Sequence, residues 1–177
     1  MTNKLQIKLL SENATMPQRN HNTDAGFDIY AAETVVLEPQ EKALIATDIA
    51  VNIPKGYVGL LTSRSGVSSK THLVVETGKI DAGFQGHMKI NVKNDMDNSI
   101  DMPTKAVLNG ERAYSLLDVS GERIGFSRNM ICYKIQKGDR LAQLVFVPIW
   151  TPELVPVKEF SNETARGEKG YESSGTR

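Results

Sequence analysis

The sequence predicts an all-β domain with the strand arrangement of a jelly roll or a small barrel. Most apolar segments are short, rich in β-branched residues and bounded by turn residues, which is typical of sandwiches and barrels. Helical periodicity is scarce, and the chain contains no internal repeat. Many short strands on one chain favour a double-sheet jelly roll or a closed barrel.

The elements follow one another at short intervals. A short helix is expected at residues 65–70, where a serine is a plausible N-cap. A proline at position 39 and the sequence IPKG at residues 53–56 interrupt the apolar segments and predict turns. The expected strands are residues 4–10, 27–31, 34–37, 44–51, 57–61, 73–76, 86–93, 130–135 and 142–148.

Two regions break this rhythm of strands. Residues 95–129 are polar and mixed, with apolar stretches at 106–108 and 114–119 that suit a small hairpin or a short helix. A loop of this length inside a domain is usually functional or disordered. Residues 161–177 are rich in Gly, Ser and Glu and resemble a flexible arm. We therefore expect one domain over residues 1–160 and an arm over 161–177.

Composition excludes several classes of protein. The chain has 177 residues and a formal net charge of +0, which argues against a duplex DNA-binding surface. No apolar segment approaches a membrane span of about 20 residues. The single cysteine, Cys132, excludes an intrachain disulfide and fits the reducing cytoplasm, and the three histidines lack metal-ligand spacing.

Two segments place charged side chains at the ends of expected strands. In residues 25–29 (AGFDI), Asp28 follows a glycine, so its carboxylate can project from the sheet rim; such an Asp is also a common turn residue. In residues 63–66 (SRSG), Arg64 offers a planar fork for phosphate oxygens. Ser65, Gly66 and the following amides suit an anion site at a helix start. The simpler interpretation of Arg64 is a loop cap.

Residues 78–86 (GKIDAGFQG) are the most informative segment. Glycines bracket a carboxylate and an aromatic ring on what resembles a hairpin. Close backbone approach there suits the recognition of a flat base by main-chain groups, and a nearby ring suits packing on a sugar. Asp81 is the candidate general base for a water molecule. A plain Asp-Ala-Gly turn is the alternative.

Two further segments combine polar side chains with glycine. In residues 137–144 (KGDRLAQL), Gln143 lies between apolar neighbours and needs a partner if it is buried, either a substrate or another core group. Residues 166–175 (RGEKGYESSG) offer an Arg, an aromatic ring and hydroxyls on a glycine frame. That set suits an arm closing over a nucleoside triphosphate, although a disordered tail has the same composition. The P-loop pattern is absent.

Taken in order, the five segments resemble the five motifs of the homotrimeric dUTPase family, over residues 24–175 apart from the middle region. The resemblance implies a jelly-roll-like β-barrel, hydrolysis of dUTP to dUMP and pyrophosphate, and Mg²⁺ as cofactor. It also implies a homotrimer in which each active site takes segments from different subunits. The roles it implies are carried by the following residues: Asp81 as base; Arg64, Ser65, Gly66 and Gln143 for phosphate; Asp28 for magnesium through water; Gly78 and Ile80 for uracil; Phe84 for deoxyribose; and Arg166, Tyr171, Ser173 and Ser174 on the arm.

The chain departs from the family pattern at several positions. Phe84 stands where a Tyr is usual, and it keeps the ring that discriminates against a 2′-hydroxyl. Ser63 replaces a proline. On the arm, Lys169 and Glu172 replace glycines and Tyr171 replaces Phe, which puts the register of the arm in doubt.

The segment at residues 95–129 resembles the insertion of dUTPases from staphylococcal phages. For that subgroup it implies binding to a repressor encoded by a phage-related island; a tolerated surface insertion is the alternative. Interface-type side chains are expected from Arg112, Tyr114, Arg123, Phe126, Arg128 and Tyr133.

Two other functions stay open from the sequence. A dCTP deaminase shares the implied fold, but the chain shows no matching acid–base carboxylate for release of ammonia. A regulatory protein-binding module would rest on residues 95–129, and it is compatible with hydrolysis.

Overall fold

The protein is an all-β domain of the expected jelly-roll type. Its computed structural model describes residues 4–97, 106–108, 111–128, 130–162, 164 and 167. The predicted helix is confirmed as α1 (Ser65–Lys70). The strands are β1 (Gln6–Leu9), β2 (Phe27–Tyr30), β3 (Val35–Leu37), β4 (Lys42–Ala46), β5 (Ile49–Asn52), β6 (Tyr57–Ser63), β7 (Leu73–Val75), β8 (Gly78–Ile80), β9 (Lys89–Asn94), β10 (Ala106–Leu108), β11 (Glu111–Leu117), β12 (Arg123–Ser127), β13 (Cys132–Ile135) and β14 (Arg140–Pro148).

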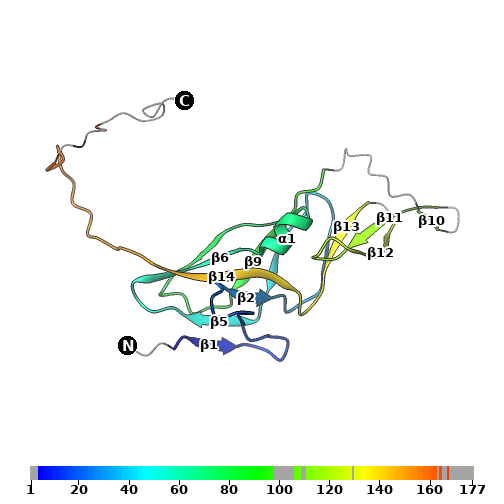
Figure 1. Ribbon diagram of the computed structural model, residues 1–177, viewed down its shortest axis with the longest axis horizontal. Coiled ribbons are helices and arrows are strands. Elements are labelled where there is room, and N and C mark those ends of the chain that lie inside the picture. Colours follow the sequence, from blue (N-terminus) through cyan, green and yellow to red (C-terminus); the bar gives the residue numbers. More distant parts are fainter. Residues whose placement is uncertain are drawn as a thin grey trace.

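The strands form several small sheets that wrap one core (Figure 1). A four-stranded sheet has the order β2-β14-β6-β8, and a three-stranded sheet has the order β4-β9-β7. A third sheet joins β10, β11, β13 and β3, with β12 paired to β11, and β1 pairs with β5. Inward side chains such as Ile29, Leu61 and Leu144 are buried together, since alternate residues of each strand face the same side.

One predicted strand is divided in the structure. Residues 44–51 were expected as a single strand, but β4 ends at Ala46 and β5 begins at Ile49. Asp48 has a φ of 52°, a left-handed conformation that ends strand pairing. The chain therefore changes partner here, from β9 for β4 to β1 for β5.

The predicted hairpin around residues 78–86 is a crossover between two sheets. β8 pairs with β6, whereas β9 pairs with β4 and β7. Residues 81–86, called the 81–86 turn below, thus connect one sheet to the next. The sequence could not distinguish a hairpin from a crossover turn, because both have the same local glycine pattern. The strand pairing of β8 and β9 makes the distinction.

The sequence did not decide between a hairpin and a short helix in the insertion, and the structure has strands there. β11 and β12 pair antiparallel, and β11 also runs parallel to β13. Between β11 and β12, Gly121 has a φ of 81°, and a Cβ at that position would lie 2.5 Å from the Lys70 carbonyl oxygen. The insertion therefore contacts the end of α1 at a position where only glycine fits.

The expected interface role of Tyr133 is wrong. Its side chain is 1% exposed, and its hydroxyl accepts a hydrogen bond from the His72 N–H at 3.0 Å. Tyr133 alternates inward on β13, so it fills the core instead of the surface. Phe126 and Ile124, by contrast, are each 43% exposed.

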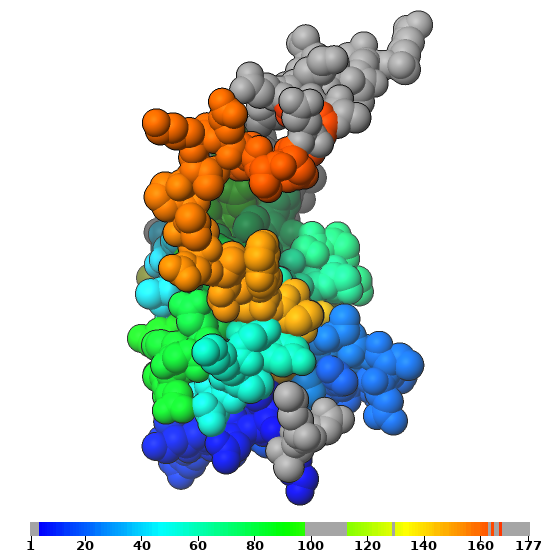
Figure 2. Space-filling view, turned by 90° about the vertical axis from the view of Figure 1, so that its left-hand side faces the viewer, coloured from blue at the N-terminus to red at the C-terminus, as the bar shows by residue number. Residues whose placement is uncertain are grey.

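Beyond β14 the chain runs away from the domain. Residues 149–160 extend from the end of β14 outside any strand, and the Ile149 N–H still donates to the Gly56 carbonyl oxygen at 2.8 Å (Figures 1 and 2). Trp150, Leu154 and Phe160 are each nearly 90% exposed. In the part of the chain that the structure describes, no helix is long and apolar enough to cross a membrane.

Candidate functional site

Asp28 is the centre of a polar cluster inside the four-stranded sheet. Its side chain is 3% exposed, and its Oδ1 accepts hydrogen bonds from Arg64 Nε at 2.8 Å and Gln143 Nε2 at 3.3 Å. Its Oδ2 accepts from Arg64 Nη2 at 3.3 Å and Arg140 Nη1 at 3.4 Å. The structure thus brings together three residues that the sequence singled out in separate segments.

Strand register explains why these residues meet. On β14, Gln143 lies directly opposite Asp28 of β2 on one side and Thr62 of β6 on the other. Arg64 follows two residues after Thr62, at the point where β6 ends. Side chains opposite one another on neighbouring strands lie within about 5.5 Å at Cβ, so the three segments converge at this rim.

The charge balance of the cluster favours a polyanionic ligand. Arg64 and Arg140 supply two cations and Asp28 one anion, and the arginines remain partly exposed, with side-chain exposures of 22% and 45%. A buried carboxylate is tolerated because both cations and an amide donate to it. The planar guanidinium of Arg64 is well suited to oxygens of a phosphate.

Two members of the cluster were missed as site residues in the sequence. Arg140 belongs to the KGDRLAQL segment. Its position at the polar start of an apolar strand could have identified it as a site residue. Asn20 accepts a hydrogen bond from Arg140 Nη1 at 3.0 Å, and Arg64 Nη1 donates to the Arg140 carbonyl oxygen at 3.1 Å. Nothing in the local sequence marks Asn20, because the contact spans 120 positions.

The start of α1 adds backbone donors beside the cluster. Arg64, and not a serine as expected, is the N-cap residue, and its side chain forms no capping bond. Ser65 and Gly66 are exposed, and a Cβ on Gly66 would meet no atom within 4 Å. The N–H groups of the first helical residues have no partner inside a helix, so they are suited to an anionic oxygen.

The other predicted residues form a second group on β8 and the 81–86 turn. Gly78 lies opposite Leu61 and Ile80 opposite Gly59, so β8 runs away from Arg64. Gly59 is needed there, because a Cβ would lie 2.8 Å from Ile53 Cδ1 and 3.3 Å from Ile80 Cβ. This packing places the backbone of β8 against the core and turns Asp81 outward, where it is exposed.

Phe84 closes the 81–86 turn. Its N–H donates to the Asp81 carbonyl oxygen at 3.0 Å, and its side chain is 44% exposed. A Cβ on Gly86 would lie 2.8 Å from Phe84 Cζ, so the ring lies directly against the glycine. An exposed ring held in this way presents a flat apolar face for a ligand.

The two groups are far apart within one chain. The turn begins beyond Ile80, opposite Gly59, whereas Arg64 follows the other end of β6. Their separation along the strand is about 15–20 Å, from a rise of roughly 3.3 Å per residue. Asp81 therefore cannot act on a phosphorus bound at Arg64 of the same chain.

Two carboxylates, Asp139 next to Arg140 and Asp118 in the insertion, have shifted pKa values. Burial raises the pKa of Asp139, assisted by the nearby charge of Asp118 and opposed by a hydrogen bond from the Gln136 N–H. The pKa of Asp118 is lowered. Burial by itself would raise this pKa, but hydrogen bonds from the Ser120 hydroxyl and from the N–H groups of Ser120 and Glu122 outweigh it. Asp118 belongs to the insertion, so the insertion's charge reaches the start of β14.

No group of three or more metal-binding side chains occurs in the described ranges of the chain. The predicted arm residues Arg166, Tyr171, Ser173 and Ser174 lie outside those ranges.

Comparisons with known proteins agree on one family. The dUTPase family model matches residues 12–108 and 126–175. A deoxyuridine 5'-triphosphate nucleotidohydrolase of Mycobacterium marinum is 35% identical over 181 residues, which cover 99% of this chain and 97% of the relative.

Solved structures from staphylococcal phages are also similar. A Staphylococcus bacteriophage 80alpha dUTPase with dUPNHPP is 58% identical, with a TM-score of 0.86 over 98% of this chain and 99% of the other. The dUTPase of phage phi11 of S. aureus, in which a species-specific insert was visualised, is 58% identical, with a TM-score of 0.77 over 91% of this chain and 100% of the other.

Proposed function

The chain belongs to the dUTPase family, and we propose that it hydrolyses dUTP to dUMP and pyrophosphate with Asp81 as the general base. The observation that carries the mechanism is the division of the site into a cationic phosphate cluster and an exposed carboxylate turn. Asp81 takes a proton from a water molecule, whose oxygen then attacks the α-phosphorus. Pyrophosphate leaves in line with that attack.

Arg64, Gln143 and the start of α1 bind the phosphates in this proposal. Displacement at phosphorus needs mainly positioning and charge neutralisation, and guanidinium and amide donors supply both. Ser65 and Gly66 offer their N–H groups beside Arg64. Both residues are exposed, and the space beside Gly66 is open to phosphate oxygens.

Magnesium fits this site in an outer role, held by Asp28 through water. Asp28 supplies hard carboxylate oxygens, as Mg²⁺ prefers, and an ion that keeps several waters needs few direct protein ligands. Both oxygens of Asp28 accept hydrogen bonds, Oδ1 from Arg64 and Gln143 and Oδ2 from Arg64 and Arg140. A water-held ion would therefore share the Asp28 oxygens with these three side chains. When bound, the ion neutralises triphosphate charge.

Recognition of the nucleoside falls to β8 and the 81–86 turn. Backbone groups of Gly78 and Ile80 read the uracil edge, and a cytosine would leave buried donors and acceptors unpaired. The Phe84 ring packs under the deoxyribose and disfavours a 2′-hydroxyl. Arg166, Tyr171, Ser173 and Ser174 then close over uracil and the phosphates as an arm.

Assembly as a homotrimer would unite the two groups. Asp81 of one chain and Arg64 of another can meet across a subunit boundary, whereas they are too far apart within one chain. Residues 149–160 support this assembly, since Trp150, Leu154 and Phe160 are exposed and need a surface to cover them. We place this activity in the cytoplasm, where the nucleotide pool lies.

The test is pyrophosphate release from dUTP by the purified protein with magnesium. Asp81→Asn should lower kcat by about 10²–10⁴, the usual contribution of a general base. An Asp81→Asn variant with unimpaired hydrolysis would contradict the proposed base. Release of ammonia from dCTP would instead favour the deaminase alternative.

A second candidate function is the binding of a protein partner through the insertion, residues 95–129. The phage 80alpha dUTPase is described as controlling transfer of virulence genes by a G protein-like mechanism. In this chain Phe126 and Ile124 are exposed on β12, and the Arg123 guanidinium lies 5.2 Å from the centre of the Phe126 ring. Exposed Arg and aromatic side chains are frequent interface anchors.

Point substitutions test this candidate better than deletion, because β11 pairs with β13 and its removal would expose a sheet edge. Phe126→Ser with Arg123→Ala should abolish binding of a phage-related-island repressor in a pull-down while hydrolysis of dUTP stays unchanged. Retained binding would exclude this surface.

A further inference from the structure

Residues 85–88, which return from the 81–86 turn toward β9, are bound to β5 and to Asp48 just before it by separate hydrogen bonds. Residues 85–87 lie outside any strand. Gln85 contacts Asn52 at one end of β5, and His87 Nε2 accepts a hydrogen bond from the Asp48 N–H at 3.0 Å just before its other end. Beyond them, the Met88 N–H donates to the Ile49 carbonyl oxygen at 2.9 Å.

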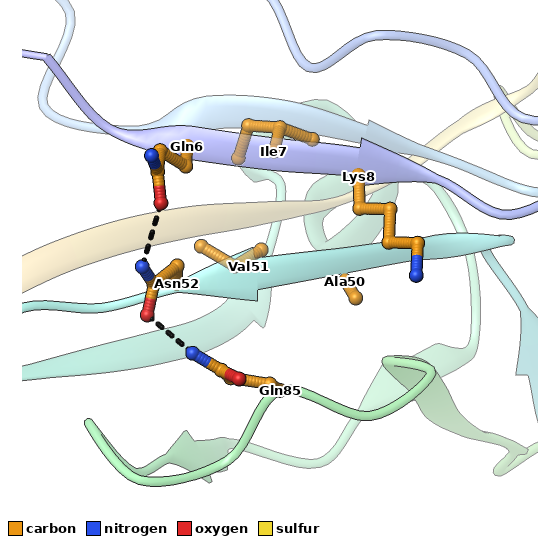
Figure 3. Close-up of a pocket in the computed structure, with 7 residues that line it drawn as sticks. All are labelled: Gln6, Ile7, Lys8, Ala50, Val51, Asn52 and Gln85. Carbon is orange, nitrogen blue, oxygen red and sulfur yellow. Dashed lines mark hydrogen bonds between the residues drawn. The ribbon is translucent and has the colours of Figure 1, made fainter.

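The Asn52 contact belongs to a chain of three amides. Gln85 Nε2 donates to Asn52 Oδ1 at 2.7 Å, and Asn52 Nδ2 donates to Gln6 Oε1 at 2.8 Å (Figure 3). These side chains line a pocket of about 250 Å³ together with Ile7, Lys8, Ala50 and Val51. The amide of Asn52 is therefore oriented from both sides, since its oxygen can only accept and its nitrogen can only donate.

This amide chain ends one residue from the ring that meets the sugar. Phe84 precedes Gln85, and its ring rests on Gly86, which follows Gln85. Within the turn itself, the described backbone bond is that from Phe84 N–H to the Asp81 carbonyl oxygen. Gln85, whose side chain is anchored to Asn52, therefore lies between Phe84 and the glycine against which the Phe84 ring rests.

We propose that Asn52 is a positioning residue for sugar discrimination, which acts through Gln85 on Phe84; this inference rests on the proposed function. Asn52 touches neither substrate nor reacting atoms in this proposal. It fixes the turn so that the Phe84 ring lies close enough to C2′ to exclude a hydroxyl. The chemical class that it selects is the 2′-deoxyribonucleotide.

The decisive measurement is the ratio of kcat/KM for dUTP to kcat/KM for UTP. Asn52→Ala removes both amide bonds, and it should lower this ratio about threefold to tenfold, the effect of losing one ordinary hydrogen bond. Gln85→Ala should lower the ratio to the same extent while β1 and β5 stay paired. This second variant decides the question if Asn52→Ala proves poorly folded.

Matched controls separate positioning from general destabilisation. Asn52→Asp keeps an acceptor for Gln85 Nε2 and should retain the wild-type ratio, and Lys8→Ala, which lines the same pocket outside the amide chain, should also retain it. Unchanged ratios in both Asn52→Ala and Gln85→Ala, or an equal loss in Lys8→Ala, would overturn the inference. A wild-type protein that does not hydrolyse dUTP would overturn the proposed function and this inference together.

Discussion

The Asp28 cluster and the 81–86 turn, which we propose are two parts of one site, are built in opposite ways. Asp28, Arg64, Arg140 and Gln143 are connected by hydrogen bonds across three strands, and the central carboxylate is 3% exposed. Asp81 and Phe84 are exposed on a turn between two sheets. The hydrogen bonds of the cluster are made within its own chain, whereas the side chains of the turn face outward. This difference is what the proposed assembly predicts, since in it the turn faces a second chain.

Mixing two inactive variants tests most directly whether the cluster and the turn of one site come from different chains. Arg64→Ala removes the cluster's main cation, and Asp81→Asn removes the base, so each homotrimer should lose about 10²-fold or more in kcat. After the two chains are unfolded and refolded together, about a quarter of the sites should combine an intact cluster with an intact turn, given random symmetric assembly. Recovery is measured as pyrophosphate release.

The control for that mixture is each variant refolded alone. If the halves of a site came from the same chain, the mixture would stay as inactive as its components. That result would contradict the trimeric site.

Asp28→Asn tests whether the cluster is held as firmly as its burial suggests. The substitution removes the charge that pairs with Arg64 and Arg140, and the free energy of unfolding should fall by about 2–3 kcal/mol. The loss is limited because both guanidinium groups reach water. Urea denaturation measures it, and Asp81→Asn serves as control, since an exposed Asp on a turn should change stability by less than about 0.5 kcal/mol.

Gly86→Ala tests the turn instead. A Cβ there would lie 2.8 Å from Phe84 Cζ, so the ring must rotate away from its present position. We expect kcat/KM for dUTP to fall by roughly threefold to tenfold, an effect of about 1 kcal/mol on binding of the transition state. The thermal midpoint should stay near that of the wild type, because the ring is exposed. Gly83→Ala, with no atom within 4 Å, is the matched control.

The smallest expected effect concerns Asp139 beside the cluster. Burial raises its pKa above the ordinary value of 3.8, so the folded chain binds this proton more tightly than the unfolded chain does. Its contribution to stability is therefore fully present below pH 3.8 and is lost as the pH rises through the raised pKa. Asp139→Asn should stabilise the protein at neutral pH by no more than about 0.5 kcal/mol.

Thermal melts of the two proteins across acidic and neutral pH check this sign. The gain of Asp139→Asn should disappear in acid. A larger gain in acid than at neutral pH would contradict the raised pKa.

Local features of the sequence were enough to predict the class of fold and many of its elements. The helix at residues 65–70 is found with the same bounds, and each of the nine predicted strands overlaps a strand of the structure. Alternation of apolar residues and the positions of Pro and Gly are local properties, so they can be read without a structure. They failed at Asp48, where a residue in the left-handed conformation divides a segment that was predicted as one strand.

By itself, the sequence determined which residues are candidates for the chemistry: carboxylates, a guanidinium and an amide placed beside glycines at strand ends. Only the tertiary structure decided which of them meet. Register across β2, β14 and β6 joins Asp28, Arg64 and Gln143 and brings in Arg140 and Asn20. The pairing of β8 with β6 leaves Asp81 beyond the other end of β6. The reason is that pairing between strands distant in sequence depends on the whole core, and no local pattern encodes it.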